Sequence, residues 1–345
     1  LRALKSREDI FDIYIQPISW GKTGWIWGDD EFRRWMDERL TKTQILIQQK
    51  KLVLDMSLQV TIPTEWSNIA PVNIGYTAGI ETTMTAPQWL VKGNEMDKII
   101  VVSNHAKSTY KGTVADATNK ETGETTKYTL ETPVDVVNYC VNESTPEPIP
   151  DFDPSTDFNF LAVSQWGPRK NFENTIKWWV EEFVDESVGL VIKTSSINNS
   201  ISDYRLTSDR LKNILSKYKD RKCKVYLLHG DLSKGQMDWL YGHDKIKCLI
   251  NIAHGEGFGL PMFEAAQAAL PVMTVGWSGQ MDFLYHKGKK YFQEVEFTIA
   301  PIQKEAVWNG VLEASSAWAF ADQGSYKMTL RKTHKKWKKA KETAT

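Results

Sequence analysis

The sequence is poor in cysteine, in long apolar runs and in net charge. Its three cysteines, Cys140, Cys223 and Cys248, are far apart and show no metal-like spacing, which argues against a disulfide framework and a zinc site. No apolar run approaches the roughly 20 residues that a membrane span needs, and no secretory leader is visible from Leu1 onward. These absences predict a protein of the reducing cytoplasm, without a membrane span.

The charges and the composition bound the class of protein. The 43 basic residues are balanced by 43 acidic ones, so only a local basic patch is left as a binding site for a polyanion. The 345 residues, 41% hydrophobic and 25% charged, suffice for two globular domains of ordinary size. The 14 tryptophans are many for this length, and because tryptophan stacks on sugar rings and bases, they hint at carbohydrate or nucleotide contact.

Short apolar runs alternate with helical patterns along the first half. Residues 30–51 carry apolar side chains at helical spacing and predict an amphipathic helix. Runs typical of strands cover residues 10–15, 58–62, 72–76, 98–103 and 134–139. Residues 119–126 are polar with Gly123 and predict a hairpin or loop tip. The alternation predicts parallel α/β units.

A stretch rich in Pro, Ser, Thr and acid, residues 142–157, interrupts this rhythm and predicts a linker. After it, strands are expected at residues 159–163, 189–193, 224–228, 248–252 and 271–275. Helices are expected at residues 171–184, 208–218, 234–241 and 261–269, with one or two more within 304–341. Two α/β halves joined in this way form a cleft at the carboxyl ends of their strands, where open α/β sheets bind ligands.

A glycine-rich string joins a buried strand to a helix in the second half. Residues 254–264 read HGEGFGLPMFE, and Pro261 suits the first turn of the helix. The free backbone N–H groups and the dipole of such a helix start form an anion site that a diphosphate can approach closely. Phosphate would repel Glu256 and Glu264, so both should contact hydroxyls, of ribose on one side and of a sugar on the other. The alternative is a plain turn, with Glu264 exposed and Glu256 as a helix-start carboxylate.

The same string, followed by Ala265-Ala266 and Leu270-Pro271-Val272, resembles the signature of glycosyltransferase family 4: two glutamates eight positions apart in an EGFGLPxxEA context. Residues 277–283 resemble the segment that follows, so the resemblance covers most of residues 159–285. It implies the GT-B fold, an α/β architecture of two Rossmann-like domains that face each other across a cleft. It also implies transfer of a hexose or pentose from a nucleotide-diphosphate sugar, most simply a UDP-sugar, to a hydroxyl, with retention and without a metal or other cofactor.

The resemblance also implies domain bounds and site residues. The acceptor-binding domain would cover residues 1–145, the linker 146–157 and the nucleotide-sugar-binding domain 158–321, with a final helix at about 322–345 that packs back on the first domain. Glu256 would be catalytic, contacting hydroxyls of the donor sugar, and Glu264 would hold the ribose. The backbone around the distal phosphate would be that of Gly257, Phe258, Gly259 and Leu260. The transfer would be a front-face displacement in which the leaving diphosphate oxygen helps to deprotonate the acceptor.

Residues 164–171, SQWGPRKN, resemble the phosphate clamp of the family, usually Gly-Arg-(apolar)-x-x-x-Lys. Lys170 occupies the Lys position, whereas Gln165 stands where Arg is usual. Arg169 is a candidate for the lost cation, because either cation neutralises phosphate and Arg does so with two parallel hydrogen bonds. The alternative is a basic surface turn before a helix. His229 follows a strand at the corner that meets the base in this family.

Two loops of the first half, at the ends of the segments 73–81 and 101–107, should point into the cleft. His105 is a candidate catalytic residue that would orient or polarise the acceptor hydroxyl, and it is equally suited to a structural role in its loop. The other candidates on the acceptor side are Trp20, Gly21, Glu65, Thr77 and Glu81.

The acceptor is not written in any of these motifs. Residues 73–82 and 96–108 are similar to glycosyltransferases of bacteriophage genomes, which can modify 5-hydroxymethylpyrimidines in DNA, and a viral protein would act in the host cytoplasm. The segment from Arg331 to Lys341 carries seven Lys or Arg and is either a solvated final helix or an electrostatic platform for DNA or anionic lipid. DNA, glycan, lipid and protein acceptors all stay open at this point.

Two other functional classes compete with the transferase. A nucleotide-sugar epimerase of the same fold would need its own acid–base residues, and an inactive nucleotide-sugar-binding module would explain Gln165. Asp151 and Asp153 match the DxD metal motif of the other large glycosyltransferase fold. They lie in the proline-rich linker and not at a strand end, so no metal site is expected there.

Overall fold

A computed structural model describes residues 1–18, 29–118, 123–140 and 144–344. The chain folds into two compact units. The first comprises Leu1–Ser57 with Ile69–Val72, and the second comprises Leu58–Asn68 with Asn73–Thr345. The second unit holds both α/β halves from β2 onward, so the candidate site can be described within it.

The first unit is built around a long amphipathic helix, α2 (Glu31–Gln48), which Asp30 caps by accepting a hydrogen bond from the Arg33 amide. A short helix, α1 (Arg2–Lys5), precedes it. The predicted strand at residues 10–15 is wrong. That segment is irregular because it binds α2 and pairs with none of the described strands: the Ile15 amide donates to Thr43 Oγ1 at 3.0 Å.

The first sheet has the strand order β1-β2-β3-β6. Its strands are β1 (Met56–Val60), β2 (Val72–Thr77), β3 (Lys98–Val101) and β6 (Val134–Val136), close to the predicted positions. β3 runs parallel to both β2 and β6. Between these strands lie η1 (Pro63–Glu65), α3 (Pro87–Asn94) and α4 (Asn104–Gly112). Antiparallel β4 (Val114–Thr118) and β5 (Thr125–Thr129) flank the hairpin or loop tip predicted at residues 119–126, of which residues 119–122 lie outside the described part of the chain.

The second sheet has six parallel strands in the order β14-β11-β10-β7-β8-β9. They are β7 (Asn159–Val163), β8 (Gly189–Thr194), β9 (Lys224–His229), β10 (Ile246–Asn251), β11 (Val272–Val275) and β14 (Gln293–Val295). The chain adds strands outward from β7 to β9 and then returns to the other side of β7 with β10. The order reverses between β7 and β10, and ligands of doubly wound sheets bind outside the carboxyl ends of the strands at this point.

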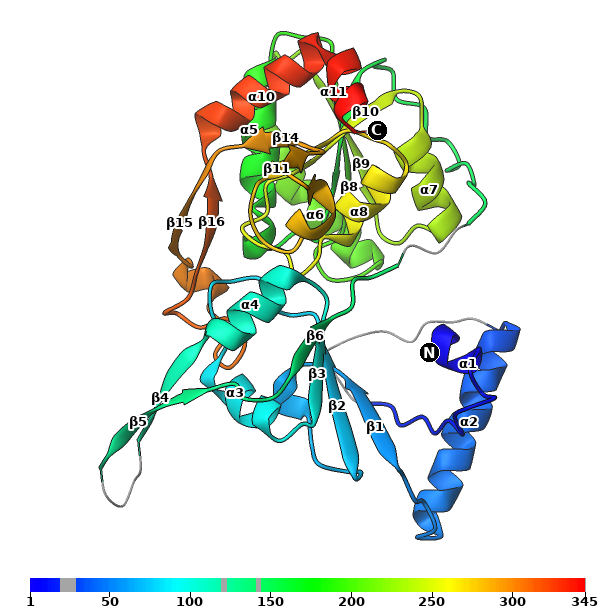
Figure 1. Cartoon of the computed structure of the whole chain (residues 1–345). Helices are drawn as coiled ribbons and strands as arrows, with labels where there is room; N and C mark the ends of the chain where they lie inside the picture. Colours follow the sequence, from blue (N-terminus) through cyan, green and yellow to red (C-terminus); the bar gives the residue numbers. More distant parts are fainter. Residues whose placement is uncertain (19–28, 119–122, 141–143, 345) are drawn as a thin grey trace. The chain divides into compact units, whose positions relative to one another are not determined.

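Helices cover both faces of this sheet (Figure 1). One face packs against α5 (Phe172–Phe183), α6 (Ile201–Leu215) and α10 (Gln323–Lys335), the other against α7 (Lys234–Gly242) and α8 (Leu260–Gln267). Alternation along β7 explains the two cores, because Phe160 and Ala162 belong to one cluster and Leu161 to the other. All three side chains are buried, as expected for a parallel sheet covered on both faces.

The end of the chain has two helices, as predicted within residues 304–341, but they begin only at Gln323, and the residues before them form other structure. β15 (Phe297–Pro301) and β16 (Ala317–Ala321) form an antiparallel hairpin, and η3 (Lys304–Ala306) lies between them. The hairpin forms in place of a helix because β16 buries Trp318 against Ile302 and Ala306. The remaining short elements are η2 (Pro168–Lys170), α9 (Met281–Leu284), β12 (Tyr285–His286), β13 (Lys289–Lys290) and α11 (Trp337–Thr343).

The last two helices pack on the second sheet. The Tyr326 hydroxyl donates to the Thr175 carbonyl at 3.2 Å, and the Trp337 indole N–H donates to the Lys247 carbonyl at 2.8 Å. The sequence predicted instead that residues 322–345 return to the first domain. The predicted bounds of the two domains stay a prediction.

Candidate functional site

Two loops meet at the point where the strand order of the second sheet reverses. One follows β7 and carries η2, and the other follows β10 and carries the glycine-rich string. They lie together because β7 and β10 are neighbours in the sheet. The His254 amide donates to the Arg169 carbonyl at 2.9 Å, and Asn171, in left-handed backbone conformation, donates through its amide group to the Ile252 carbonyl at 3.3 Å.

The glycine-rich loop ends in the start of α8. Gly259 has a φ of 94°, a left-handed conformation that favours glycine, and Leu260 begins the helix with Pro261 in its first turn. The Gly259 carbonyl accepts from the Met262 and Phe263 amides. Within the described ranges, no protein acceptor binds the amides of Phe258, Gly259 and Leu260. The start of α8 therefore offers donors to an anion.

A cluster of four charged side chains lies beside this loop. Glu256 binds Lys170 Nζ at 2.5 Å through one carboxylate oxygen and Arg169 at 3.2 Å through the other. Arg169 also donates to the Gly255 carbonyl at 2.7 Å and lies 3.4 Å from Glu81 Oε1. The Glu256 side chain is only 8% exposed. Two carboxylates thus balance two cations in a largely buried place, and Lys170, Arg169, Glu256 and Glu81 from the prediction are brought together.

Burial and the partner charges set the protonation of this cluster. Burial raises the pKa of Glu256, but Lys170 and Arg169 outweigh it, so its pKa lies below the ordinary value. Burial raises the pKa of Glu81, and Arg169 opposes this only in part. Burial also lowers the pKa of the Lys170 ammonium against the attraction of Glu256. Glu256 is therefore the ionised anchor of the cluster at neutral pH.

Glu264 belongs to a second polar group, on the first turns of α8. It accepts a hydrogen bond from the Tyr241 hydroxyl at 3.1 Å, and burial raises its pKa despite that bond. Lys193 lies near it at the end of β8, where burial lowers the pKa of its ammonium while Asp231 and Glu264 oppose the shift. The sequence analysis missed Lys193, although its place at the carboxyl end of a strand beside the site could have indicated it.

Gln165 and His229 lie at the carboxyl ends of strands of the second sheet, Gln165 after β7 and His229 at the end of β9. Gln165 donates to the Ser196 carbonyl at 3.0 Å, and no contact joins it to Glu256 among the described residues. His229 Nε2 lies 2.8 Å from Asp203, both side chains being nearly buried. Burial raises the pKa of Asp203, but the hydrogen bonds from His229 and from two backbone amides outweigh burial, so the pKa lies below its ordinary value. The hydrogen bond between Asp203 and His229 also fixes the orientation of the His229 ring. Asp203 was missed because α6 begins at Ile201, seven residues before the predicted start.

The candidate site residues of the first half of the chain lie in different surroundings. Glu81 joins the charged cluster, whereas Glu65 is exposed in η1. Thr77 Oγ1 and His105 Nε2 are buried without a partner among the described residues, and the His105 ring packs edge-on against Trp277 at 4.8 Å. Trp20 and Gly21 lie outside the described residues.

The glycine-rich loop also packs tightly on the loop that follows β2. A Cβ atom on Gly255 would overlap the Glu81 carbonyl, and one on Gly257 would overlap the Ala78 carbonyl. Asp282 of α9 accepts hydrogen bonds from the Asn104 amide at 2.9 Å and from the Asn138 side chain at 3.0 Å. The close approach of the Glu81 and Ala78 carbonyls explains why glycine occupies positions 255 and 257 of the string.

His254, which opens the string, has a structural role. Its Nδ1 lies 2.7 Å from the Ala319 carbonyl and its Nε2 lies 3.0 Å from Gln303, while its ring stacks on Trp318. Burial lowers its pKa, so the ring is neutral at ordinary pH. His254 thereby ties the start of the glycine-rich loop to the β15–β16 hairpin.

The described residues show neither a metal cluster nor a membrane-spanning helix. Over the described ranges, no group of three or more His, Cys, Asp or Glu side chains could hold a metal ion. Asp153 of the DxD-like string pairs with Lys245 at 2.6 Å. None of the helices that the structure describes combines the length and the apolar character needed to cross a bilayer.

The largely buried imidazole of His105 predicts a pH-dependent stability. Burial lowers its pKa from an ordinary 6.5 to about 4. The unfolded chain therefore takes up this proton first as pH falls from about 6.5 to about 4, so the folded state loses stability over that window and not below it. Relative to a His105→Gln variant, we expect the wild type to lose at most about 3 kcal/mol of unfolding free energy there.

Urea unfolding at the two ends of this pH window measures the difference between wild type and variant. Exposed His286, replaced by Gln, is the matched control and should leave the pH dependence unchanged. A constant difference between wild type and His105→Gln at all pH values would contradict the buried, neutral imidazole.

Comparison with proteins of known structure identifies the fold. No protein-family model matches the sequence, and no curated protein matches it. Sucrose-phosphate synthase from Thermosynechococcus elongatus is similar in structure, with a TM-score of 0.57 and 12% identity over 94% of this chain and 74% of that one. An S. aureus TarM variant in complex with UDP has a TM-score of 0.50 and 12% identity over 86% of this chain, which spans only 54% of that protein. A trehalose-6-phosphate synthase, studied for glycosyltransfer with retention, has a TM-score of 0.50 and 10% identity over 90% of this chain and 73% of that one.

These structural neighbours are GT-B glycosyltransferases. Identities of 10% to 12% establish the fold. The chain is therefore an α/β protein of the GT-B fold, with two Rossmann-like domains, as the sequence predicted.

Proposed function

We propose that this protein is a retaining glycosyltransferase that moves a sugar from a nucleotide-diphosphate sugar, with UDP as the expected nucleotide, to a hydroxyl acceptor without a metal. One observation carries the proposal. At the reversal point of a doubly wound sheet, amides at the start of α8 that have no acceptor in the described part of the chain lie beside two cations that a buried carboxylate holds. That combination suits a ligand with a diphosphate next to a ring of hydroxyls.

The proposed roles follow from the chemistry of each group. The amides of Phe258, Gly259 and Leu260 would bind the distal phosphate, and Lys170 and Arg169 would neutralise its charge while remaining in reach of Glu256. Glu256 is ionised, so it would accept hydrogen bonds from hydroxyls of the donor sugar. Glu264 would accept hydrogen bonds from the ribose in the same way.

The proposed step is a front-face displacement. The acceptor oxygen forms a bond to the anomeric carbon on the face from which the diphosphate leaves, and the bond between that carbon and the phosphate oxygen breaks. The acceptor proton passes to the leaving phosphate oxygen, so atoms and charge balance without a second carboxylate. Lys170, Arg169 and the start of α8 would stabilise the charge that develops on the diphosphate.

The proposed acceptor is a hydroxyl of a 5-hydroxymethylpyrimidine in DNA, in a phage-type enzyme of the cytoplasm that transfers a hexose or pentose. The similarity of residues 73–82 and 96–108 to bacteriophage glycosyltransferases supports this acceptor. Glycan, lipid and protein hydroxyls are the alternatives that an assay must separate.

A donor and acceptor panel tests the function. The protein is incubated with UDP-, GDP- and ADP-sugars and with hydroxymethylcytosine DNA or simple glycans, and nucleotide release and acceptor mass are measured. We expect UDP release with a mass gain of one sugar. Tight donor binding without turnover of any donor would instead indicate an inactive module, and conversion of the donor sugar to an isomer would indicate an epimerase.

Lys170→Ala is expected to lower kcat/KM for the donor by about 10- to 100-fold, mostly through KM. The substitution removes one charge-assisted contact to phosphate, which is worth about 1.5 to 3 kcal/mol. Steady-state kinetics with varied donor concentration measure the effect. Exposed Lys177→Ala, on the next turns of α5, is the control and should keep wild-type kinetics. An unchanged donor KM in folded Lys170→Ala would refute the clamp.

A further inference from the structure

The last two helices concentrate positive charge in a chain whose net charge is zero. Between Gln323 and Thr343, α10 and α11 carry eight Lys or Arg residues and a single acidic residue, Glu342. The charge is therefore segregated to one part of the second unit.

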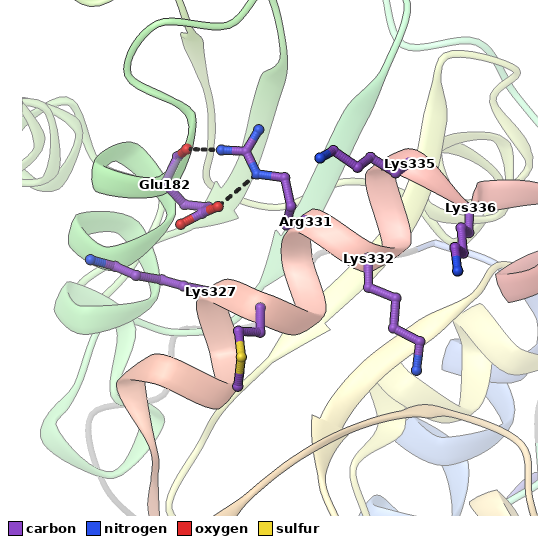
Figure 2. Close-up of a pocket in the computed structure, with 7 residues that line it drawn as sticks. Glu182, Lys327, Arg331, Lys332, Lys335 and Lys336 are labelled. Carbon is purple, nitrogen blue, oxygen red and sulfur yellow. Dashed lines mark hydrogen bonds and ion pairs between the residues drawn. The ribbon is translucent and has the colours of Figure 1, made fainter.

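Three of these cations anchor the helices. Lys327 pairs with Glu181 at 2.6 Å, and Arg331 Nε pairs with Glu182 at 2.7 Å, both acids lying on α5. Lys341 donates to the Ala269 carbonyl at 2.6 Å. Figure 2 shows Arg331 turned toward Glu182, whereas Lys332 and Lys336 extend away from Glu182. These contacts hold the helices on the second sheet without using the remaining lysines.

The remaining five lysines, Lys332, Lys335, Lys336, Lys338 and Lys339, form what we call the α10–α11 lysine face. All five are exposed, and none has a side-chain partner among the residues that the structure describes. Three of them line a hollow of about 390 Å³, which Arg331 and Met328 also line (Figure 2). The face is thus an open, concave surface of unpaired positive charge.

The apolar sides of the two helices face inward. Tyr326 and Leu330 are fully buried and Ala340 is nearly so, whereas Met328 is the one exposed large hydrophobic side chain in the described part of these helices. A helix that lies in a membrane interface needs an exposed apolar face to bury among the lipids. In the described part of α10 and α11, the apolar side chains other than Met328 face the protein. The lysine face therefore suits a ligand that binds through charge alone.

The lysine face lies away from the candidate site. α5 begins at the loop after β7 and ends near Val184, whose carbonyl accepts from the Lys222 amide at 2.7 Å just before β9 begins. Trp337 binds the Lys247 carbonyl at the start of β10. The face is therefore at the amino ends of the strands, while the site loops follow their carboxyl ends. Strands of this length separate the two by about 20 Å, so a small substrate cannot reach both.

We propose that the α10–α11 lysine face docks the phosphate backbone of a nucleic acid that carries the acceptor hydroxyl. This inference rests on the proposed transferase function. Exposed lysines on flexible stems neutralise successive phosphates and release their counterions, which is how proteins bind nucleic acid without reading its sequence. A duplex covers about 20 Å in about six base pairs, so a modest length of it reaches from the lysine face to the donor site.

The direct test is fluorescence anisotropy of a labelled duplex of about 20 base pairs, titrated with full-length protein at about 50 to 200 mM KCl. The test variant is Lys332→Gln, Lys335→Gln and Lys336→Gln together. The control replaces three other exposed lysines, Lys50, Lys51 and Lys287, by Gln and so removes the same charge.

Wild type and control are expected to bind the duplex with a steep salt dependence. The test variant should bind at least about 10-fold more weakly, and the slope of log K against log salt should fall by about 3, one for each lost phosphate contact. Its UDP release with a small acceptor should stay at the wild-type level, because these lysines do not touch the site. The donor assay can therefore succeed or fail independently of this result.

Two outcomes would overturn the inference. One is duplex binding that is absent, or equal in wild type and test variant. The other is sedimentation with vesicles of phosphatidylglycerol and phosphatidylcholine that needs the three lysines, together with no binding of the duplex, which would assign the face to a membrane surface. Circular dichroism checks that the variants are folded.

Discussion

Glu256→Gln is expected to lower sugar transfer by at least about 1000-fold while the protein stays folded. The two oxygens of this buried carboxylate hold Lys170 and Arg169, and in the proposed reaction they also accept hydrogen bonds from the donor sugar. The variant keeps the shape but loses the charge, so the site loses both its sugar acceptor and the anchor of its two cations. Groups that stabilise charge in a closed site typically contribute 100- to 1000-fold each, and Glu256 acts on two of them.

The same substitution has a cost in stability. It leaves two largely buried cations with Glu81 as their remaining carboxylate, and breaking such a buried network costs about 3 to 5 kcal/mol of unfolding free energy. Because the pKa of Glu256 is lowered in the folded state, its contribution is present above the ordinary carboxylate range and is lost as pH falls through the folded pKa. The stability difference between wild type and variant should therefore shrink at acid pH.

UDP release, UDP binding by calorimetry and urea unfolding separate these effects. Exposed Glu173→Gln on α5 is the matched control, because it removes the same charge outside the cluster. Wild-type transfer by Glu256→Gln would refute the catalytic role. If the variant is too unstable to assay, a Lys170→Gln and Glu256→Gln double variant removes one charge of each sign. That variant should regain stability without regaining activity.

The sequence was most informative where local chemistry and tertiary structure agree. The apolar strand before the glycine-rich string and Pro261 after it predicted the strand, loop and helix of β10 and α8 to within two residues. Strand spacing predicted every strand of the second sheet except β14. Neighbouring parallel strands release their loops at one edge of the sheet, and this brings Lys170 and Glu256 together although 86 positions separate them.

The misses have a common physical cause, which is competition from partners that no local pattern shows. Residues 10–15 alternate like a strand, but their backbone binds Thr43 of α2. Residues 317–321 look helical in their neighbourhood, but Trp318 is buried by pairing with β15. Asp203 and Lys193 carry no motif of their own, and the resemblance of residues 277–283 assigned no role to Asp282. The roles of all three follow only from the residues that folding brings to them.

Arg169 shows how far a motif can be trusted. The sequence suggested that it replaces the cation missing at Gln165, and it does lie in the charged cluster with Lys170. It is shared, however, between Glu256, the Gly255 carbonyl and Glu81 from the loop after β2. That second carboxylate could be named a candidate from its loop but could not be paired with Arg169, because the pairing depends on how two loops 88 positions apart in the sequence pack.

Gly255→Ala is expected to remove most of the activity through packing alone. Its Cβ would overlap the backbone carbonyl of Glu81, which cannot turn aside as the end of a side chain can. Overpacking of this kind lowers the unfolding free energy by about 1 to 3 kcal/mol. The overlap is relieved when the glycine-rich loop shifts away from the loop after β2. Such a shift moves Glu256, the adjacent residue, and displacements of about 1 Å at a reacting centre cost about 100-fold in rate.

Gly242→Ala is the control that separates this effect from the loss of a glycine as such. Gly242 ends α7 with nothing within 4 Å of an added Cβ, so its replacement should leave transfer unchanged and raise the unfolding free energy by up to about 1 kcal/mol. Gly257→Ala, which overlaps the Ala78 carbonyl, should behave like Gly255→Ala. Kinetics and thermal melting of the three variants test the argument. Full activity in both loop variants would show that this contact between the two loops is not held during transfer, and Glu256 would then depend on α8 and its two cations alone.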